Sequence, residues 1–529
     1  MIVNYDTEFG SPSIIEELAG GDVEQLASDY LALFDEAGVA ADSIWWCWLD
    51  GNYANYPSKL LPQWELDGLR AWWEAGVDPL RVFLEATHRR GKEAFLSYRI
   101  NGTDMTAVTP LSEPLLKRAH PEWLLHTWKS LGNPGYWNFA VPEVRDYKVA
   151  ILQELAENYD YDGIEIDFAR VPVTLPPGEQ WEGREHLTEL MRSVRAATLE
   201  VERKRSRPFL LAARIPETLE GCHFDGIDVE AWVAERLIDL LVLGNRSLEV
   251  DLEVFRGVVA GSPIKLYPCL DDHHASDGYL HPPIEVLRGV FANWWHQGAD
   301  GIQTFNFLNT AATAVSEKRK AELTAYQPLH RQVYRELADP EGLQALDKAF
   351  VLQRRGGGHG PTVVPNPEDW DTPRWMYYLT NMQAALPAEL ARDGRADTLL
   401  TVYIADDLAA RPHLVERVEL RLLLSDPREA GAPGDARLPS EVVASQAHHL
   451  VTSPPLISTA DAVEVRVNNG LLRGGGRQGG WLLFEARPTQ LAVGRNLIGV
   501  RCGATRSVAD PAMVVEKLEV WVRYRRQAD

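Results

Sequence analysis

The feature that most constrains the fold is a repeated alternation of short apolar runs with longer amphipathic segments, which continues from the first residue to about residue 350. Runs rich in β-branched and aromatic residues predict strands, whereas apolar residues at helical spacing predict helices. The helical spacing is evident at 141–159, where Val144, Tyr147, Ala150, Ile151 and Leu155 recur. The strands that we predict are Ile2–Tyr5, Ser43–Leu49, Glu93–Ile100, Asp162–Phe168, Phe209–Ile215, Ile238–Leu243, Ile264–Leu270 and Gly301–Phe305.

Eight consecutive strand–helix units favour parallel strands, because each helix returns the chain to the end of the sheet where the next strand begins. Eight such units in about 350 residues predict an α/β fold of the (β/α)8 TIM-barrel type with enlarged loops. A doubly wound open sheet is the alternative.

The C-terminal third of the chain follows a different pattern. The segment "RRGGGHGPTVVPNPEDWDTP" is rich in Gly and Pro, as linkers are. Beyond it, runs such as "DAVEVRVNNG" and "KLEVWVRYR" alternate apolar with polar residues, which predicts strands with one solvated face. Since 529 residues exceed a single core, we predict a catalytic barrel at 1–350, a linker at 351–375 and a jelly-roll-like β-sandwich at 376–529.

Composition and charge exclude several classes of protein. The formal net charge of −23 opposes binding to nucleic acid, which depends on clustered Lys and Arg. The sequence contains no run of about 18 apolar residues, so no membrane-spanning helix is predicted. The cysteines, Cys47, Cys222, Cys269 and Cys502, lack zinc-site spacing and are expected to be buried free thiols. The N-terminal sequence does not resemble a signal peptide, so we expect a cytoplasmic protein or a secreted one whose signal peptide is absent from this sequence.

The stretch "YDYDGIEIDFAR" at 159–170 places four carboxylates in what otherwise looks like a buried strand. Side chains alternate between the faces of a strand, so Ile164, Ile166 and Phe168 share one face and Glu165 and Asp167 the other. On the fourth strand of a barrel, the apolar face packs on the helices and both carboxylates point inward. Asp167 is nearer the C-terminal end, where barrel enzymes keep their active sites.

A structural role is the alternative for both acids. Glu165, inside the barrel, is suited to an ion pair with Arg99 or Arg214. Asp167 is expected at the wet mouth of the barrel, where folding does not require a carboxylate.

Polar residues also follow several other predicted strands. Ser97, Arg99 and Asn101 end the third strand, and Arg214 and Glu217 end the fifth. The carboxyl ends of the strands meet at one rim of a barrel, so these side chains are expected to converge on one pocket. The remaining candidates at this rim are Trp48, Asp50, Asn245, Asp271, Asp272, His273 and Asn306.

Carboxylates, guanidiniums and amides in one pocket are suited to the hydrolysis of a glycoside. One carboxylic acid protonates the leaving oxygen, while a second carboxylate attacks the anomeric carbon or activates water. We predict Asp167 as nucleophile or base and Asp271, Asp272 or Glu217 as proton donor, with Asp271 and Asp272 favoured because they directly follow their strand. No cofactor and no metal are expected, and the oligomeric state is not predicted. The residues expected to bind the sugar are Glu165, Arg99, Asn101, Arg214, Asn245, His273, Trp48, Asp50 and Asn306.

Four segments carry a family resemblance. "SYRIN", "HPEWLL", "NFAVPEVRDYKVAILQELAENYDYDGIEIDFAR" and "GADGIQTFNF" resemble the glycosyl-hydrolase-like TIM-barrel proteins labelled family 10 glycosylhydrolase. The resemblance extends over about residues 1–330 and implies a barrel that acts on carbohydrate.

Two other families are similar in the fourth-strand motif. "DGIEIDFA" resembles the chitinase signature D-G-x-D-x-D-x-E, but Ala169 occupies the position of its catalytic Glu. It also resembles the D-G-x-R-x-D pattern of α-amylase-like barrels, although Glu165 replaces the Arg. That resemblance implies Asp167 as nucleophile, Glu217 as acid, and Asp271 or Asp272 as the residue that supports the transition state.

Two other functions remain open. A carbohydrate-binding protein with a catalytically disabled barrel would also match the loss of the chitinase Glu. A metal-dependent hydrolase or isomerase would use Asp271, Asp272, His273, His274 and His281, although neighbouring side chains in one loop diverge. The β-sandwich is expected to pack against the barrel, with carbohydrate binding as the alternative. The asparagines of the sequons "NGT" and "NRS", at 101 and 245, are interpreted as ligand contacts.

Overall fold

Eight parallel strands in the N-terminal part of the chain close into a barrel, in the order β1-β10-β9-β8-β7-β6-β3-β2. The computed structural model therefore confirms the predicted TIM barrel, and the pairing of β10 with β1 excludes an open sheet. The strands are β1 (Ile2–Asp6), β2 (Ser43–Leu49), β3 (Glu93–Arg99), β6 (Gly163–Asp167), β7 (Leu210–Ile215), β8 (Leu240–Leu243), β9 (Lys265–Asp271) and β10 (Gln303–Phe305).

The structure describes most of the chain, and several segments at the ends of the barrel strands lie outside this part. The described residues are 1–6, 21–49, 53–63, 67–101, 115–125, 136–170, 172–244, 247–271, 279, 282–305, 307, 328–354, 384–426, 428, 462–478 and 480–525.

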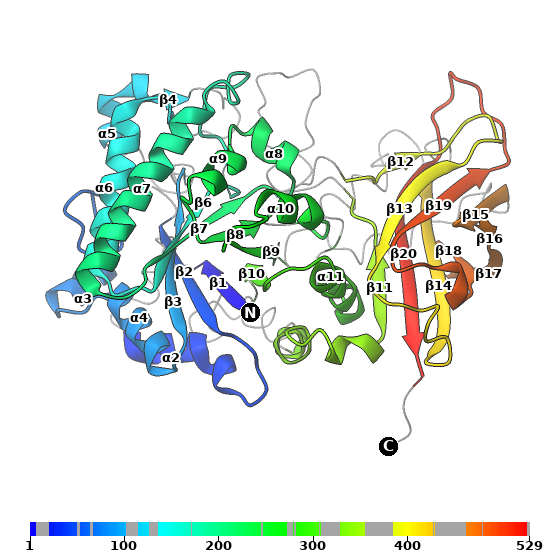
Figure 1. The fold of residues 1–529 in the computed structure, drawn as a ribbon, viewed down its shortest axis with the longest axis horizontal. Coiled ribbons are helices and arrows are strands. Elements are labelled where there is room, and N and C mark those ends of the chain that lie inside the picture. The colour runs from blue at the N-terminus through cyan, green and yellow to red at the C-terminus, as the bar shows by residue number, and fades with distance from the viewer. Residues whose placement is uncertain are drawn as a thin grey trace.

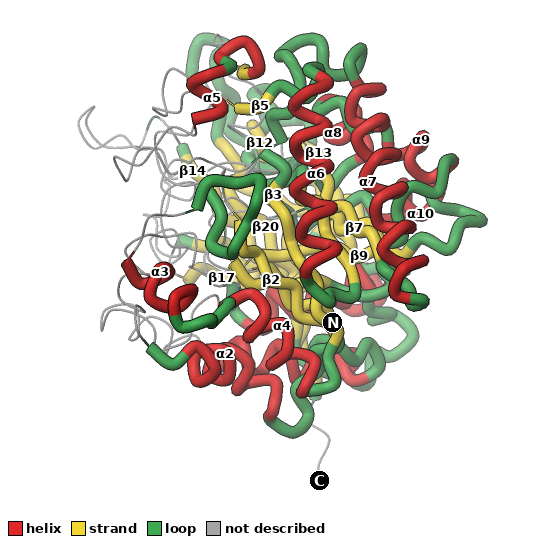
Figure 2. The backbone as a smooth tube through the Cα atoms, turned by 90° about the vertical axis from the view of Figure 1, so that its left-hand side faces the viewer, coloured by secondary structure: helices red, strands yellow, loops and turns green. Residues whose placement is uncertain are grey.

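Helices surround the barrel, and α6 and α7 run side by side on the face turned toward the viewer in Figure 2. The predicted helical face is present in α6, where Val144, Ile151 and Leu155 are buried. None of the described helices has the length and apolar character needed to cross a membrane. The helices are α2 (Val23–Leu31), α3 (Asp67–Glu74), α4 (Pro79–Arg89), α5 (Leu115–Ala119), α6 (Pro142–Asn158), α7 (Arg184–Arg205), α8 (Leu219–Phe224), α9 (Val229–Ala234), α10 (Leu252–Val258), α11 (Ile284–His296) and residues 328–336.

The barrel strands bury both of their faces. Ile164, Ile166 and Phe168 belong to the large core shared with the helices. A smaller apolar cluster fills the barrel interior, with Trp45 stacked on Phe95 at 4.6 Å between ring centroids. The predicted division of the β6 side chains between two faces is confirmed, because Glu165 and Asp167 bond to side chains of other barrel strands.

The C-terminal part contains two antiparallel sheets whose apolar faces share one core. One sheet has the order β11-β20-β14-β18-β17, with β12 beside β20, and the other has the order β13-β19-β15-β16. All four cysteines are free and buried, as predicted. The strands are β11 (Lys348–Val351), β12 (Ala388–Glu389), β13 (Thr398–Ile404), β14 (Val415–Ser425), β15 (Val463–Val467), β16 (Gly470–Leu471), β17 (Arg473–Gln478), β18 (Trp481–Ala486), β19 (Gly494–Cys502) and β20 (Val514–Tyr524).

Helix α11 of the barrel packs against β11, the edge strand of the larger sheet, and α11 lies between the barrel strands and the C-terminal sheets in Figure 1. A Cβ atom on Gly289 of α11 would come within 2.2 Å of the carbonyl oxygen of Ala349 in β11, so only glycine permits this approach. The side chain of Asn293 donates to the carbonyl of Tyr403 at 3.0 Å and accepts from the amide of Ala405 at 3.0 Å. The two parts of the chain are therefore in direct and specific contact.

Candidate active site

Strand β6 brings two carboxylates into the interior of the barrel. The strand begins at Gly163, where an added Cβ atom would lie 2.4 Å from the carbonyl oxygen of Leu210 and 2.4 Å from a ring atom of Phe95. Glycine at this position lets β6 pair closely with its neighbours. Two and four residues later, Glu165 and Asp167 face inward, and their side chains are fully buried.

Glu165 on β6 is at the centre of a polar network to which four other strands contribute side chains. Its Oε2 atom accepts hydrogen bonds from Asn4 Nδ2 at 2.9 Å and Ser97 Oγ at 2.5 Å, and its Oε1 atom accepts one from Gln303 Nε2 at 3.2 Å. Arg214 Nε lies 3.9 Å from Oε1. Burial raises the pKa of Glu165, and the positive charge of Arg214 only partly opposes this shift.

Asp167 forms a closer ion pair with the same arginine. Its Oδ2 atom accepts a short hydrogen bond from Arg214 Nη2, and its Oδ1 atom accepts one from the backbone amide of Arg170 at 2.9 Å. Asp167 is 1% exposed. The expectation of an open position for Asp167 is therefore wrong in this structure, because the carboxylate at the end of the strand is buried and ion-paired.

Arg214 connects the two carboxylates, and its guanidinium stacks on the aromatic ring of Phe305. Its guanidinium lies 4.0 Å above the centroid of Phe305, and Nη1 is 3.9 Å from Cys269 Sγ. Burial opposes its charge, but Asp167 and Glu165 outweigh this effect and raise its pKa above the usual range. Burial also raises the pKa of the Cys269 thiol, to about 12, which makes a thiolate role for this residue unfavourable.

Three other described candidates for acid and binding roles are at or just beyond the ends of barrel strands. Asp271 is the last residue of β9, is 1% exposed, and stands opposite Phe305 in the strand register. Arg99 stands opposite Asp167, with its guanidinium 6.0 Å from the Phe305 centroid. Glu217, 7% exposed, follows β7 and packs against Gly244 at the end of β8. These side chains come from strands that end at the same rim.

Two predicted binding residues have other roles in the structure. The Asn101 side chain donates to the carbonyls of Val173 and of Trp137, the latter at 3.0 Å, and accepts from the amide of Trp137 at 3.1 Å. Both amide hydrogens are thus used by the backbone. Trp48 packs on the helix side of its strand, 5.0 Å from Phe83 between ring centroids. We therefore do not include Asn101 or Trp48 in the proposed site.

The remaining predicted residues lie outside the described part of the chain, so the structure does not place them. They are Asp50, Asn245, Asp272, His273 and Asn306, together with His274 and His281 of the metal-dependent alternative. Within the described residues, no three His, Cys, Asp or Glu side chains form a group that could hold a metal ion.

Sequence reasoning missed Asn4 and Gln303, which both donate to Glu165. Each is a polar residue at an inward position of an otherwise apolar strand, in "IVNYD" and "GIQTFNF". The alternation argument used for Glu165 would have identified both.

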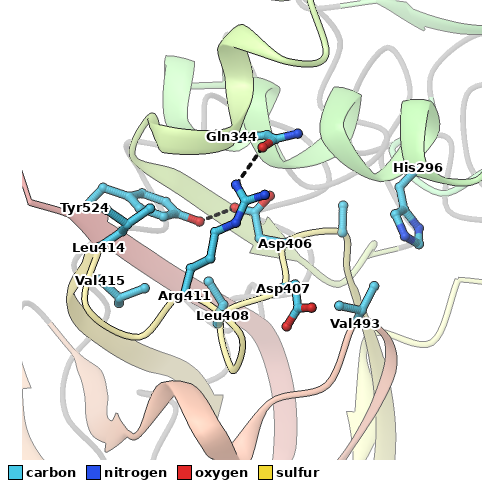
Figure 3. A pocket seen from close by; sticks show the side chains of 11 residues that line it. His296, Gln344, Asp406, Asp407, Leu408, Arg411, Leu414, Val415, Val493 and Tyr524 are labelled. Carbon is cyan, nitrogen blue, oxygen red and sulfur yellow. Dashed lines mark hydrogen bonds between the residues drawn. The ribbon is translucent and has the colours of Figure 1, made fainter.

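A separate pocket of about 290 Å³ lies between α11, the 3-10 turn η5 (Gly342–Ala345) and the C-terminal sheets (Figure 3). Arg411 in this pocket donates to Gln344 at 2.7 Å, and Asp406 accepts from Lys348 at 2.8 Å and from Tyr524. His296 ends α11, the helix that returns the chain to the start of β10. The pocket therefore lies toward the opposite end of the barrel from Asp167.

Fold and site together define a (β/α)8-barrel protein with acidic residues in its interior and a C-terminal β-sandwich. Residues 28–179 match the model of the family described as Glycosyl hydrolase-like 10, which confirms the predicted resemblance for this segment. The matched segment contains Arg99, Glu165 and Asp167, but not Arg214, Glu217 or Asp271.

Named relatives match a similarly short part of the chain. Glycosyl hydrolase YngK of Bacillus subtilis (strain 168) is 37% identical over 118 residues, which is 22% of each chain. Glycosyl hydrolase DigH of Escherichia coli (strain K12) is 29% identical over 124 residues, 22% of this chain and 28% of its own. The match thus spans less than a third of either relative.

Solved structures align over longer stretches at low identity. The glycoside hydrolase domain of PgaB (BpsB) from Bordetella bronchiseptica aligns with 64% of this chain and 98% of its own, at 11% identity and a TM-score of 0.38. The α-L-fucosidase isoenzyme 2 of Paenibacillus thiaminolyticus aligns with 99% of both chains, at 11% identity and a TM-score of 0.40.

Proposed function

We propose that this protein is a glycoside hydrolase in which Asp167 is the nucleophile or general base. The observation that carries the proposal is the buried cluster of Asp167, Glu165 and Arg214 where strands β6 and β7 end. The match of residues 28–179 to a glycosyl-hydrolase-like family supports it, because this segment contains Asp167.

The contacts of Asp167 are compatible with this chemistry. A buried nucleophile or base must carry a negative charge, and the guanidinium of Arg214 compensates that charge. Each carboxylate oxygen has two lone pairs, and the described contacts use one on each oxygen. The second lone pair on each oxygen has no partner among these contacts, and the proposal assigns it to a substrate carbon or a water molecule.

The proton donor is proposed among Asp271, Asp272 and Glu217. Hydrolysis requires a second carboxyl group beside the scissile oxygen. Asp271 is inward-facing at the end of β9, and Glu217 follows β7 two residues after its last residue, Ile215. Arg99, opposite Asp167 in register, is proposed to bind substrate hydroxyl groups.

The test is turnover of a panel of aryl glycosides and plant or algal oligosaccharides. Asp167→Asn is expected to lower turnover by about 10²–10⁴-fold, since it removes the nucleophile or base while conserving shape. Asp160→Asn is the matched control, because Asp160 belongs to the same stretch but is 68% exposed. The anomer released first, followed by NMR, distinguishes a nucleophile from a base at 167.

A carbohydrate-binding protein with a disabled barrel is the second candidate. The low exposed fraction of Asp167, 1%, favours this candidate, because a carboxylate that only stabilises the barrel needs no access to a ligand. Under this hypothesis the panel gives no turnover with the wild-type protein, and calorimetric titration gives the same sugar affinity for wild type and Asp167→Asn. Turnover that depends on Asp167 contradicts it.

A further inference from the structure

A second cavity, of about 310 Å³, lies where the barrel meets the C-terminal sheets. We call it the junction cavity, and it shares no lining residue with the pocket of Figure 3. Its walls come from the segment between β8 and α10, from helix α11, and from strands β11, β13 and β19. Its apolar and aromatic lining consists of Leu248, Val250, Val290, Val351, Trp294 and Tyr403.

Asp251 contributes a half-buried carboxylate to this cavity. It is the N-cap residue of α10, and an aspartate at that position commonly accepts hydrogen bonds from the first amides of the helix. The Asp251 side chain accepts none of them. Within the described residues, no other group donates a hydrogen bond to this carboxylate or forms an ion pair with it. Burial raises the pKa of Asp251, and the charge of Arg495 only partly opposes this shift.

Glu249 lines the same cavity two residues earlier in the chain. Its carboxylate accepts a hydrogen bond from the backbone amide of Gln353 at 3.3 Å. Burial raises the pKa of Glu249 from 4.5 to about 7, and the like charge of Asp251 adds to the shift. Two carboxylates that repel each other in a poorly solvated cavity are both stabilised by a cation that binds beside them.

Among the described residues that line the cavity, Arg495 is the only basic one, and it is already paired. Its Nη2 atom lies 2.8 Å from Glu253 Oε2, and its side chain is 65% exposed. Tyr403 is occupied as well, because its hydroxyl is hydrogen-bonded to His296 Nδ1 at 2.8 Å. The junction cavity therefore combines an excess of negative charge with apolar and aromatic walls.

We propose that the junction cavity binds an organic ammonium ion, with Asp251 and Glu249 as the partners of the charged group and the apolar lining as the contact of its hydrocarbon part. Ammonium groups form charge-assisted hydrogen bonds with carboxylates and are attracted to aromatic rings. A divalent metal ion matches the lining less well, because Ca²⁺ takes six to eight oxygen ligands and apolar side chains form much of these walls. A neutral ligand would leave the negative charge uncompensated.

The site does not depend on the proposed hydrolysis. Among the described candidates, Asp167, Asp271 and Glu217 are all absent from the lining of the junction cavity. A protein without glycosidase activity could bind the cation equally well, so the binding experiment tests this inference by itself.

The probe is n-butylammonium chloride, and the neutral control is n-butanol in the same concentration of sodium chloride. Calorimetric titration of the full chain at pH 6 and pH 8 measures both affinities. An alkylamine has a pKa close to that of lysine, about 10.4, so the probe is charged at both pH values. The variants are Asp251→Asn and Glu249→Gln. Asp407→Asn is the matched control, because Asp407 lines the separate pocket of Figure 3.

Wild type is expected to bind butylammonium about tenfold more tightly at pH 8 than at pH 6, since the ionised fraction of Glu249 rises by that factor around its pKa of about 7. Asp251→Asn should weaken binding by about tenfold at both pH values, the effect of losing one charged hydrogen bond. Glu249→Gln should weaken binding at pH 8 and abolish its pH dependence, whereas Asp407→Asn should bind as wild type does.

Three results overturn the proposal. They are equal affinity of wild type for butanol and butylammonium, unchanged affinity in Asp251→Asn, and a wild-type protein that shows no saturable binding of butylammonium. Melting temperatures verify that each variant is folded under the conditions of the titration.

Discussion

Arg214 is the residue on which the interior of the barrel depends most. It contacts both inward-facing carboxylates of β6 and stacks on Phe305, with no exposed surface. An uncompensated buried carboxylate is far more costly than an ion pair. We therefore expect the arginine to stabilise the fold whether or not Asp167 takes part in catalysis.

Arg214→Met is expected to lower the free energy of unfolding by about 3–5 kcal/mol, because it leaves Glu165 and Asp167 buried without their counter-ion. The triple variant Glu165→Gln/Asp167→Asn/Arg214→Met should regain part of this loss, since it removes the unpaired charges as well. Urea unfolding followed by tryptophan fluorescence measures both. A single variant as stable as wild type contradicts the assigned role of the ion pair.

At the scale of elements, the barrel strands follow from the sequence because their apolar runs are short and regularly interrupted. The eight predicted strands match the observed ones to within two residues at their ends. The same alternation places Trp48 on the helix side, beside Trp46, so its assignment to the sugar site contradicted the pattern. The role of Asn101 was not predictable, because its partners at 137 and 173 are distant in sequence.

The alternation of apolar and polar residues predicts only part of the environment of β20. It correctly separates the two faces of the strand, but it does not reveal what covers the polar one. Lys517 and Glu519 both contact Tyr279, which lies 240 positions before Glu519 in the sequence. Likewise, the ion pair of Asp167 depends on the register between β6 and β7, which a single sequence does not specify.

The close approach of α11 to β11 gives a prediction for these elements. Gly289→Ala is expected to destabilise the protein by about 1–3 kcal/mol, because the new methyl group meets the backbone of β11, which has little freedom to move. Gly257→Ala in α10 is the matched control, since no atom lies within 4 Å of the added Cβ. The control should gain about 0.5–1 kcal/mol from helix propensity. Thermal unfolding of both variants measures these changes in stability. Equal changes for Gly289→Ala and Gly257→Ala would contradict the tight contact between α11 and β11.

At the scale of the whole molecule, Glu249 lies where barrel and sandwich meet. It lines a pocket of about 310 Å³ together with Trp294 of α11, Tyr403 of β13 and Arg495 of β19. Its backbone amide donates to the side chain of Gln353 at 2.8 Å, and its carboxylate accepts from the Gln353 amide at 3.3 Å. Burial raises the pKa of Glu249 from 4.5 to about 7.

This shift makes the stability of the junction depend on pH. Between pH 4.5 and about 7, the folded protein retains a proton on Glu249 that the unfolded chain has lost. Stability contributed by this group therefore falls as pH rises through that window and is constant above it. Glu249→Gln, which imitates the protonated form, should be close to wild type at pH 5 and more stable at pH 8. The gain is up to about 3 kcal/mol, and smaller where water reaches the carboxylate.

Melting temperatures at pH 5 and pH 8 measure this difference. Glu182→Gln is the control, because Glu182 is exposed on the barrel surface. A difference between Glu249→Gln and wild type that does not grow from pH 5 to pH 8 contradicts the role of Glu249.

The position of β20 in its sheet has a consequence for the synthesis of the protein. β20 is the last strand along the chain, yet it pairs with β11 on one side and β14 on the other. All eight barrel strands have left the ribosome long before β20 is made, so the barrel can close early, since domains fold largely in order of translation. The Tyr279 hydroxyl can form its hydrogen bond only after Glu519 has been synthesised. A nascent chain would thus carry a closed barrel before the strand that contacts Tyr279 has been made.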